Sequence, residues 1–377
     1  MLVGMNRPFC FFCQVPMVKN GHHPSGVQRW KCAKCDTQKT HRIDTSAKDL
    51  NMFISWLLGN TTMAQMPGKG RTFRRKTRKF WDIWPLSPVV DEKFGVIYLD
   101  GIHLGRKAVV LIARNDEHVL GWYVARNERT VAWKALLERI AAPDVVVCDG
   151  GSGLKTALAK CWSSSRVQRC TFHVFNQIKT ATTMRPKLPA SKEMYQLGKQ
   201  LIRVKTPSQA SEWLTKWGNW YTKYAEFLDE KSYDENGTWR YTHERVRSAR
   251  NRVHKLIKQG TLFTYLDPDL TGYLGVLPAM NNKIEGATNA TLRQMLFQHR
   301  GMSLARRIKA IFWHCYMHSP NPLPVAQILK VMPTDASIER VYQQIRQVPQ
   351  IQDLPQWGDK ITWADLHHTT PWTNAWD

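Results

Sequence analysis

The chain has 377 residues, a length typical of two or three domains rather than one. Its 54 Lys and Arg outnumber 30 Asp and Glu, and the formal net charge of +24 favours a polyanionic partner such as nucleic acid. No apolar run approaches the roughly 18 residues that a membrane-spanning helix needs, and the first residues lack the basic-then-apolar order of a signal peptide. We therefore expect a cytoplasmic, nucleoid-associated protein without a membrane partner.

Four of the eight cysteines form two C-x-x-C pairs near the start of the chain: Cys10, Cys13, Cys32 and Cys35. Two such pairs can bind one tetrahedral Zn²⁺, whereas a redox dithiol or two disulfides would be the alternatives. Without a secretion signal the thiols should stay reduced. Because four thiolates leave no coordination position for catalysis, we expect one structural zinc in a zinc ribbon over residues 1–44.

The next segment combines helical patterns with a tight turn. Apolar residues after Thr45 recur at helical spacing, then a short segment and the break P-G-K-G lead to a second helix, RTFRRKTRKFWDIW. This is the plan of a helix-turn-helix DNA-binding domain, predicted over residues 45–88, although a solvated charged face is the alternative. The residues expected to contact DNA are Arg71, Arg74, Arg75, Arg78 and Lys79.

An α/β pattern follows from residue 89. GVIYLDGIHL reads as a strand ending at Asp100, and KAVVLIARN and HVLGWYVAR as two more strands. The helix TVAWKALLERI, the buried strand DVVVCDGG, the helix GLKTALAKC and the short strand RVQRC come next. Three strands followed by helix, strand, helix and strand is the order of a ribonuclease H-like domain. We predict the first part of such a core over residues 89–184.

Helical spacing replaces the strand pattern over residues 185–278, which predicts an all-helical insertion. Trp213, Trp217, Trp220 and Tyr224 recur on one helical face, a stripe more typical of a helix core than of a ligand platform. The basic helix THERVRSARNRVHKLIKQG could follow a phosphate backbone or simply be solvated.

Two aspartates stand where strands are expected to end, Asp100 in YLDG and Asp149 in CDGG. Either one alone could cap a helix or turn. In the predicted order the first and fourth strands are neighbours, so both carboxylates should converge, and Mg²⁺ is the natural cation for an all-oxygen site that faces phosphate. The valines before Asp149 read as a buried strand, and the glycines after it should leave space for metal and DNA backbone.

The segment MNNKIEGATNATLRQMLFQHRGMS is unusually polar for a helix. Asn281, Asn282, Glu285 and Asn289 lie about one turn apart, and Arg293 continues the row. We predict the second part of the core over residues 279–320, with Glu285 as a third carboxylate and DNA contacts from Asn282 and Arg293. The alternative is a solvated helix with a capping Glu. Residues 321–377 are expected to form a C-terminal tail.

Four blocks, YLDG, CDGG, RCTFH and NNKIEGATNATLRQ…HRG, resemble the signatures of Mutator-type bacterial insertion-sequence transposases of the DDE superfamily. The N-terminal modules resemble the branch with a zinc ribbon. The resemblance implies that Asp100, Asp149 and Glu285 are a catalytic triad that binds two Mg²⁺ (or Mn²⁺) ions, and that Cys170 and His173 match the family's C-x-x-H element.

The resemblance also implies a function: a DNA transposase that binds the terminal inverted repeats of a mobile element and catalyses Mg²⁺-dependent strand cleavage and strand transfer by a two-metal-ion mechanism. Its expected partners are double-stranded DNA, both element ends and target, and a second copy of the chain in a homodimer on DNA. A non-catalytic, sequence-specific DNA-binding regulator and a nuclease without strand transfer are the alternatives. Whether Cys170 and His173 bind a metal, pack or contact DNA stays open, because two ligands do not complete a zinc site.

Overall fold

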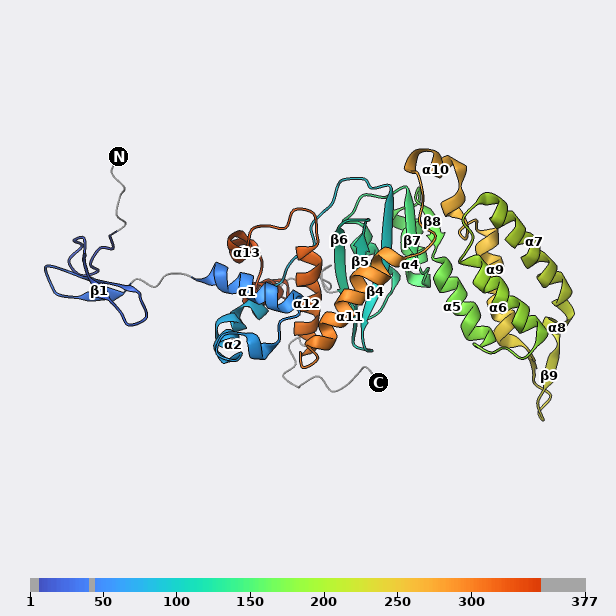
Figure 1. Ribbon diagram of the computed structural model, residues 1–377, viewed down its shortest axis with the longest axis horizontal. Helices are drawn as coiled ribbons and strands as arrows, with labels where there is room; N and C mark the ends of the chain where they lie inside the picture. The colour runs from blue at the N-terminus through green and yellow to red at the C-terminus, as the bar shows by residue number, and fades with distance from the viewer. Residues whose placement is uncertain (1–6, 41–44, 347–377) are drawn as a thin grey trace.

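The computed structural model describes residues 7–40 and 45–346. A mixed sheet lies in the middle of the elongated molecule, with a helical unit at one end and the N-terminal strands beyond a second group of helices at the other (Figure 1). The chain is therefore a mixed α/β protein. No helix in the described ranges is long and apolar enough to cross a membrane.

The N-terminal unit is a three-stranded antiparallel sheet of β1 (Val18–His22), β2 (Gln28–Lys31) and β3 (Gln38–Thr40). Its buried apolar cluster consists only of Cys10, Met17, Trp30 and Cys32. A core of this size is too small to hold a chain segment folded without a metal or a cross-link.

Two helices follow, as predicted, but the second is shorter than expected. These elements are α1 (Ser46–Leu58), η1 (Met63–Gln65), α2 (Arg71–Thr77) and the 3₁₀ helix η2 (Arg78–Asp82). The tight turn before α2 is made by Gly68, Lys69 and Gly70, all with positive φ. Trp56 of α1 packs with Phe73 of α2, and Phe53 packs with Trp56 and reaches Trp313, 6.2 Å away between ring centroids. The pair of helices thus shares its core with the rest of the protein.

The central sheet has the strand order β6-β5-β4-β7-β8. Its strands are β4 (Val96–Leu104), β5 (Ala108–Arg114), β6 (Val119–Ala125), β7 (Val145–Cys148) and β8 (Arg166–Arg169). The first three run antiparallel, whereas β4, β7 and β8 are parallel. The order of elements predicted for this region is confirmed, but β4 continues for four residues past Asp100 because it pairs with β5 as far as Leu104.

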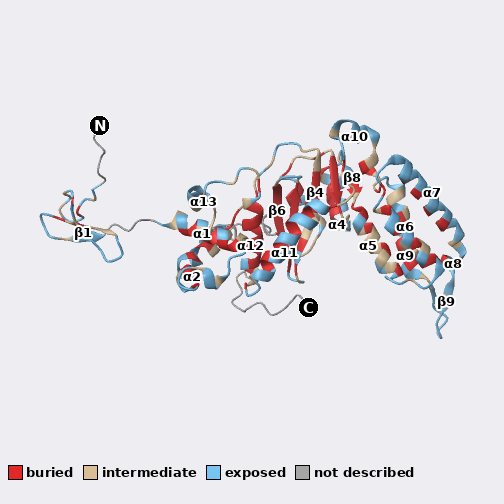
Figure 2. Ribbon diagram, in the orientation of Figure 1, coloured by how far each residue is buried: buried red, intermediate tan, exposed pale blue. Residues whose placement is uncertain are grey.

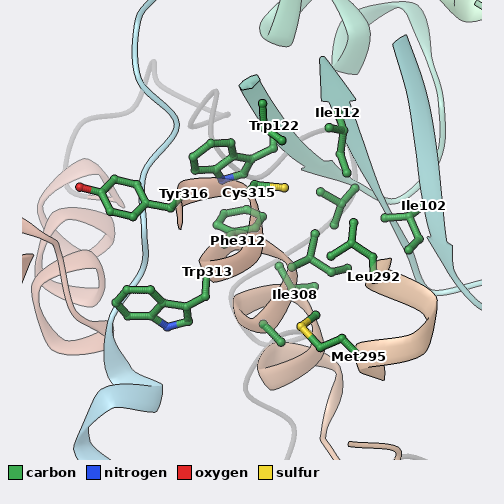
Figure 3. Packing of buried hydrophobic residues seen from close by; sticks show 14 of the residues in the cluster. Ile102, Ile112, Trp122, Leu292, Met295, Ile308, Phe312, Trp313, Cys315 and Tyr316 are labelled. Atoms are coloured by element: carbon green, nitrogen blue, oxygen red, sulfur yellow. The ribbon is translucent and has the colours of Figure 1, made fainter. Parts of the chain in front are cut away.

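Helices cover both faces of this sheet, which explains why every residue of β5 and β6 is buried (Figure 2). One face packs against α3 (Thr130–Leu137) and α4 (Ser152–Cys161). The other packs against α11 (Ala290–Gln298) and α12 (Leu304–Met317), where Trp122 and Ile112 of the sheet meet Phe312, Ile308 and Leu292 (Figure 3).

The helical unit leaves the sheet after β8. Its helices are α5 (Thr171–Thr182), α6 (Pro189–Leu201), α7 (Pro207–Lys223), α8 (Ala225–Asp229) and α9 (Glu244–Lys258). Trp213, Trp217 and Trp220 of α7 are buried, as predicted, and Trp213 Nε1 donates to Leu197 O at 2.9 Å. The expectation of helices alone is wrong, since β9 (Lys231–Tyr233) and β10 (Trp239–Tyr241) form a hairpin between α8 and α9.

The chain then returns to the sheet through η3 (Thr264–Leu266), α10 (Pro268–Leu274) and the π-helix η4 (Lys283–Asn289). Part of the expected tail is folded, as α13 (Val325–Val331) and α14 (Asp335–Arg346). Ile328 and Ile338 are buried in the main core, and the Asp335 carboxylate accepts hydrogen bonds from Lys309 Nζ and Trp84 Nε1, both at 2.6 Å. The remaining residues of the expected tail, 347–377, lie outside the described residues.

Candidate active site

Asp100 and Asp149 are brought together by the register of two parallel strands. Leu99 of β4 lies opposite Cys148 of β7, so the next residue on each strand is an aspartate. Side chains alternate along β4, and Tyr98 and Ile102 belong to the cluster that faces α11 and α12. Asp100 therefore points toward the side of the sheet that is covered by the returning segment 279–317.

Both oxygens of the Asp100 carboxylate accept a hydrogen bond. Oδ1 accepts the backbone N–H of Gly101 at 2.9 Å, and Oδ2 accepts Asn289 Nδ2 at 2.7 Å. Burial, with the charges of Asp149 and Glu285 adding to it, raises the pKa of Asp100 to about 7. The other two carboxylates predicted from the sequence thus lie close enough to affect the ionisation of Asp100.

Glu285 stands on the π-helix η4, whose extra residue per turn changes the direction in which side chains point. Its Oε1 is 3.2 Å from His173 Nδ1 and 3.8 Å from Cys170 Sγ. Hydrogen bonds with Cys170 and with Glu285 raise the pKa of His173 to about 10, which favours the imidazolium form beside the carboxylate. The C-x-x-H element therefore contacts the third carboxylate directly.

The polar row predicted along this segment is only partly correct. Asn281 and Asn289 are buried, and Asn281 Nδ2 donates to Leu99 O at 3.0 Å. Asn282, the N-cap of η4 and the residue after Asn281, is exposed instead, because neighbouring residues of a helix point in different directions, and Arg293 on α11 is exposed as well. Both remain available to a partner, but neither continues the buried row.

Sequence reasoning missed Glu128 and His103. Glu128 lies in the loop between β6 and α3, and its Oε1 accepts His103 Nε2 at 3.0 Å. A Cβ on Gly101 would come within 2.4 Å of Glu128 Oε1, and a Cβ on Gly153 within 2.2 Å of the Glu128 carbonyl oxygen. The glycines that follow Asp100 and Asp149 were the available signal, since such glycines permit close approach of another segment.

This geometry corrects the expectation for the CDGGSG loop. Gly150 has φ 75°, and a Cβ there would overlap the Arg169 guanidinium, 1.1 Å from Nη1. Gly150 and Gly153 thus make room for parts of the protein itself. Only Gly151, where a Cβ would meet Glu128 Oε2 at 3.9 Å and Asp149 Oδ1 at 4.0 Å, borders space beside the carboxylates.

The four N-terminal cysteines cluster, with all Sγ atoms within 4.8 Å of one another. The two C-x-x-C turns have matching backbones. Gln14 and Asp36, the residues after each pair, have φ of 52° and 58°, and each donates its N–H at 3.0 Å to the carbonyl of the first cysteine. Two equivalent turns that face one another are compatible with a tetrahedral zinc site.

The predicted DNA-contacting residues of α2 and η2 (Arg71, Arg74, Arg75, Arg78 and Lys79) are all exposed, while Phe73 and Phe80 are buried. Arg74 also lines a groove of about 580 Å³ between the α1–α2 turn and residues 298–302, which include Arg300. Helix α11 leads from η4, which carries Glu285, to residues 298–302 at this groove.

The known proteins that this chain resembles are all transposases. Residues 100–251 match the family model of Mutator-family transposases, a span that includes Asp100, Asp149 and the C-x-x-H element but ends before Glu285. The chain is 24% identical over 148 residues to the transposase for insertion sequence element IS1201 of Lactobacillus helveticus, and 23% over 157 residues to that for IS905 of Lactococcus lactis. A probable insertion-sequence transposase of Corynebacterium diphtheriae is 28% identical over 119 residues.

The match to the Lactobacillus transposase covers 35% of this chain and 40% of the relative, and the match to the Lactococcus transposase covers 37% and 40%. The match to the Corynebacterium protein covers 27% of this chain and 35% of the relative. The family model spans the central sheet from Asp100 to β8 and most of the helical unit. The protein is accordingly related to the Mutator-type insertion-sequence transposases.

Proposed function

We propose that the protein is a DNA transposase that cleaves and joins DNA strands with a DDE triad of Asp100, Asp149 and Glu285. The observation that carries the proposal is the placement of the carboxylates: Asp100 and Asp149 directly follow the paired residues Leu99 and Cys148, and the charges of Asp149 and Glu285 add to burial in raising the pKa of Asp100. A buried carboxylate with two further carboxylates beside it is typical of a site completed by divalent cations.

The sheet supports this assignment. Three antiparallel strands followed by two parallel ones, with helices on both faces, agree with a ribonuclease H-like core, and the helical unit interrupts it between β8 and η4. In this interpretation residues 89–184 and 279–320 form the core, and residues 185–278 the insertion. The carboxylates come from two neighbouring strands and from the segment that returns after the insertion.

The donor set fits Mg²⁺ or Mn²⁺, two ions per site in the proposed mechanism. All three donors are carboxylates, and the buried Oδ1 of Asn289, next to Asp100, has no hydrogen-bond partner among the described residues. When bound, the ions supply positive charge that stabilises the reacting phosphate and lowers the pKa of a coordinated water.

The protein's own groups fix the positions of the carboxylates. Gly101 N–H and Asn289 hold the two oxygens of Asp100, Gly151 N–H donates to Asp149 Oδ1 at 3.1 Å, and His173 pairs with Glu285. Such preorganisation removes the need to reorient acidic groups when DNA arrives.

The basic surface supplies the DNA-binding part of the proposal. Exposed Arg and Lys on α2 and η2 can neutralise backbone phosphates, and the groove lined by Arg74 and Arg300 adds two further cationic side chains. We propose that these residues, with Asn282 and Arg293, bind the terminal inverted repeats, that the zinc ribbon extends the contact, and that two copies assemble on DNA.

The test is strand cleavage of DNA carrying the ends of the element that encodes the chain, in Mg²⁺. We expect nicks at the ends and strand-transfer products with the wild type, and neither with Asp100→Asn, Asp149→Asn or Glu285→Gln. Asp269→Asn, an exposed carboxylate on α10, is the matched control. Cleavage without joining would indicate a nuclease, and DNA binding with no cleavage by the wild type would indicate a regulator.

A further inference from the structure

A second group of metal-ligating side chains lies outside the ribbon. Cys170, the residue before α5, His173 in its first turn, and Glu285 on η4 offer three donor atoms within 4.8 Å of one another. We propose that these residues form a second Zn²⁺ site, and that zinc bound there inhibits the Mg²⁺-dependent reaction by occupying Glu285. The inhibition rests on the proposed transposase function, whereas the zinc site itself does not.

The spacing of the donor atoms fits zinc. With Zn–N and Zn–O bonds of about 2.0 Å and a Zn–S bond of about 2.3 Å, tetrahedral ligands stand about 3.3 Å (N to O) and about 3.5 Å (S to O) apart. The observed separations are 3.2 Å from His173 Nδ1 to Glu285 Oε1 and 3.8 Å from Cys170 Sγ to the same oxygen. Small side-chain movements, with release of one proton each from the Cys170 thiol and the His173 imidazolium to solvent, would therefore complete three corners of a tetrahedron.

Backbone hydrogen bonds fix the position of Cys170 and favour its thiolate as a metal ligand. Cys170 is fully buried, and its N–H is fixed on Cys148 O at 2.9 Å. Its Sγ accepts the backbone N–H of Asn281 at 3.3 Å, and Asn281 is itself anchored on Leu99 O. An N–H donor directed at sulfur offsets the negative charge of a metal-bound thiolate, and anchored second partners are typical of metal ligands.

The site differs from the ribbon in having one position open. Four thiolates close a structural zinc site, but Cys170, His173 and Glu285 leave a fourth position for water or a phosphate oxygen. Thiolate and imidazole favour Zn²⁺ strongly over Mg²⁺, which prefers oxygen donors. Zinc can thus bind at a concentration far below that of Mg²⁺.

The consequence for the active site follows from charge. Glu285 contributes to the negative potential at Asp100. A Zn²⁺ ion on Glu285 Oε1 would cancel that contribution and remove an oxygen from the set that holds Mg²⁺. We expect zinc to raise the Mg²⁺ concentration needed for half-maximal cleavage at least about tenfold, which corresponds to about 1.4 kcal/mol.

The first experiment counts zinc in the full-length protein, titrated with Zn²⁺ alone and analysed by native mass spectrometry. We expect two zinc ions per chain in the wild type and one in Cys170→Ser and in Glu285→Gln. Glu285→Gln changes a half-buried side chain, so it is less disruptive to folding than Cys170→Ser, which changes a buried one. Cys161→Ser, which alters a cysteine of neither cluster, should keep two.

The second experiment repeats strand cleavage over a range of Mg²⁺ concentrations with and without micromolar zinc. One zinc per chain in the wild type, or two in Glu285→Gln, would overturn the site and leave the transposase proposal intact. Two zinc ions with an unchanged Mg²⁺ requirement would overturn the inhibition. If two zinc ions bind but no condition gives cleavage, the zinc site is supported and the transposase function fails.

Discussion

The N-terminal ribbon and the central sheet both place ligating side chains close together, but by opposite means. In the ribbon two of the four buried core residues, Cys10 and Cys32, are themselves proposed ligands. In the core Asp100 stands on a central strand, Asp149 directly after the neighbouring strand and Glu285 on η4, and helices on both faces bury the sheet. If the proposed sites are correct, the ribbon depends on its ligands for its structure, whereas the core holds its carboxylates in place without them.

The largest effect is expected from removing a ribbon ligand. Cys32→Ser should abolish high-affinity zinc binding and unfold residues 7–40, because a structural zinc contributes roughly 10 kcal/mol of binding free energy to such units. Hydrogen exchange should show loss of protection in β1–β3 and none in β4–β8. Loss of protection in the sheet as well would contradict the division between the two regions.

In the core we expect the reverse: removing a carboxylate should abolish activity and leave the fold intact. Asp149→Asn should lower the rate of strand cleavage at least about 10³-fold, which corresponds to about 4 kcal/mol, and leave the Tm close to that of the wild type. The side chain lies beyond the end of β7 and carries no part of the buried cluster. A variant that melts much earlier would show that the carboxylate also supports the fold.

A third prediction concerns α1 and α2, which share the main core despite being adjacent to the ribbon. Phe53→Ala should destabilise the core by about 3 kcal/mol in urea unfolding, since the ring is fully buried among Trp56, Phe80 and Trp313. Val89→Ala, at an exposed apolar residue, is the control and should cost less than about 0.5 kcal/mol. Equal effects would mean that the helices fold independently.

The carboxylate cluster should give the core a pH dependence. Asp100 ionises near pH 3.9 in an unfolded chain but has a pKa of about 7 when folded, so the folded state retains its proton longer. Without divalent cations, the free energy of unfolding should therefore fall as pH rises from about 4 to 7. His173, with its pKa raised to about 10, is protonated in both states below pH 6 and contributes little to this slope there.

Asp100→Asn removes the titrating group and keeps the shape of the side chain. The free energy of unfolding of this variant should therefore change less than that of the wild type over the same pH range. Chemical unfolding at pH 5 and pH 7 measures the difference, and added Mg²⁺ should reduce it in the wild type. An identical slope in the wild type and the variant would show that other groups set the pH dependence.

The smallest effect is expected at the basic helix. Arg75→Ala should weaken binding to end DNA several-fold and reduce the slope of log affinity against log salt concentration by about 1, as for one lost phosphate contact. Arg340→Ala on α14, also exposed, is the matched control. An unchanged salt dependence for Arg75→Ala would exclude this side chain from the interface.

The elements with strong periodicity were predictable from sequence, and those determined by tertiary contacts were not. The valine strand before Asp149 and the tryptophan stripe of α7 follow directly from spacing and burial. The hairpin β9–β10 has strands of only three residues, too short for a periodic signal.

For the site, too, only the residues placed by strand order could be predicted from the sequence. Asp100 and Asp149 were predictable because strand order fixes their separation. The positions of Glu128 and His103 depend on how a loop folds over Gly101. The exposure of Asn282 depends on which side of the segment before η4 packs against the sheet. Neither feature leaves a pattern in the local sequence. The folded helices α13 and α14 are held through Asp335, whose partners Trp84 and Lys309 are distant along the chain.

The convergence of three carboxylates on one cation site is tested most directly by counting Mn²⁺ ions bound to the DNA complex by electron paramagnetic resonance. The account predicts two Mn²⁺ per active site in the wild type, with binding weakened at least about tenfold in Glu285→Gln, the one member of the triad that the family match does not include. Unchanged Mn²⁺ binding in that variant would show that Glu285 is not a ligand and would contradict the account.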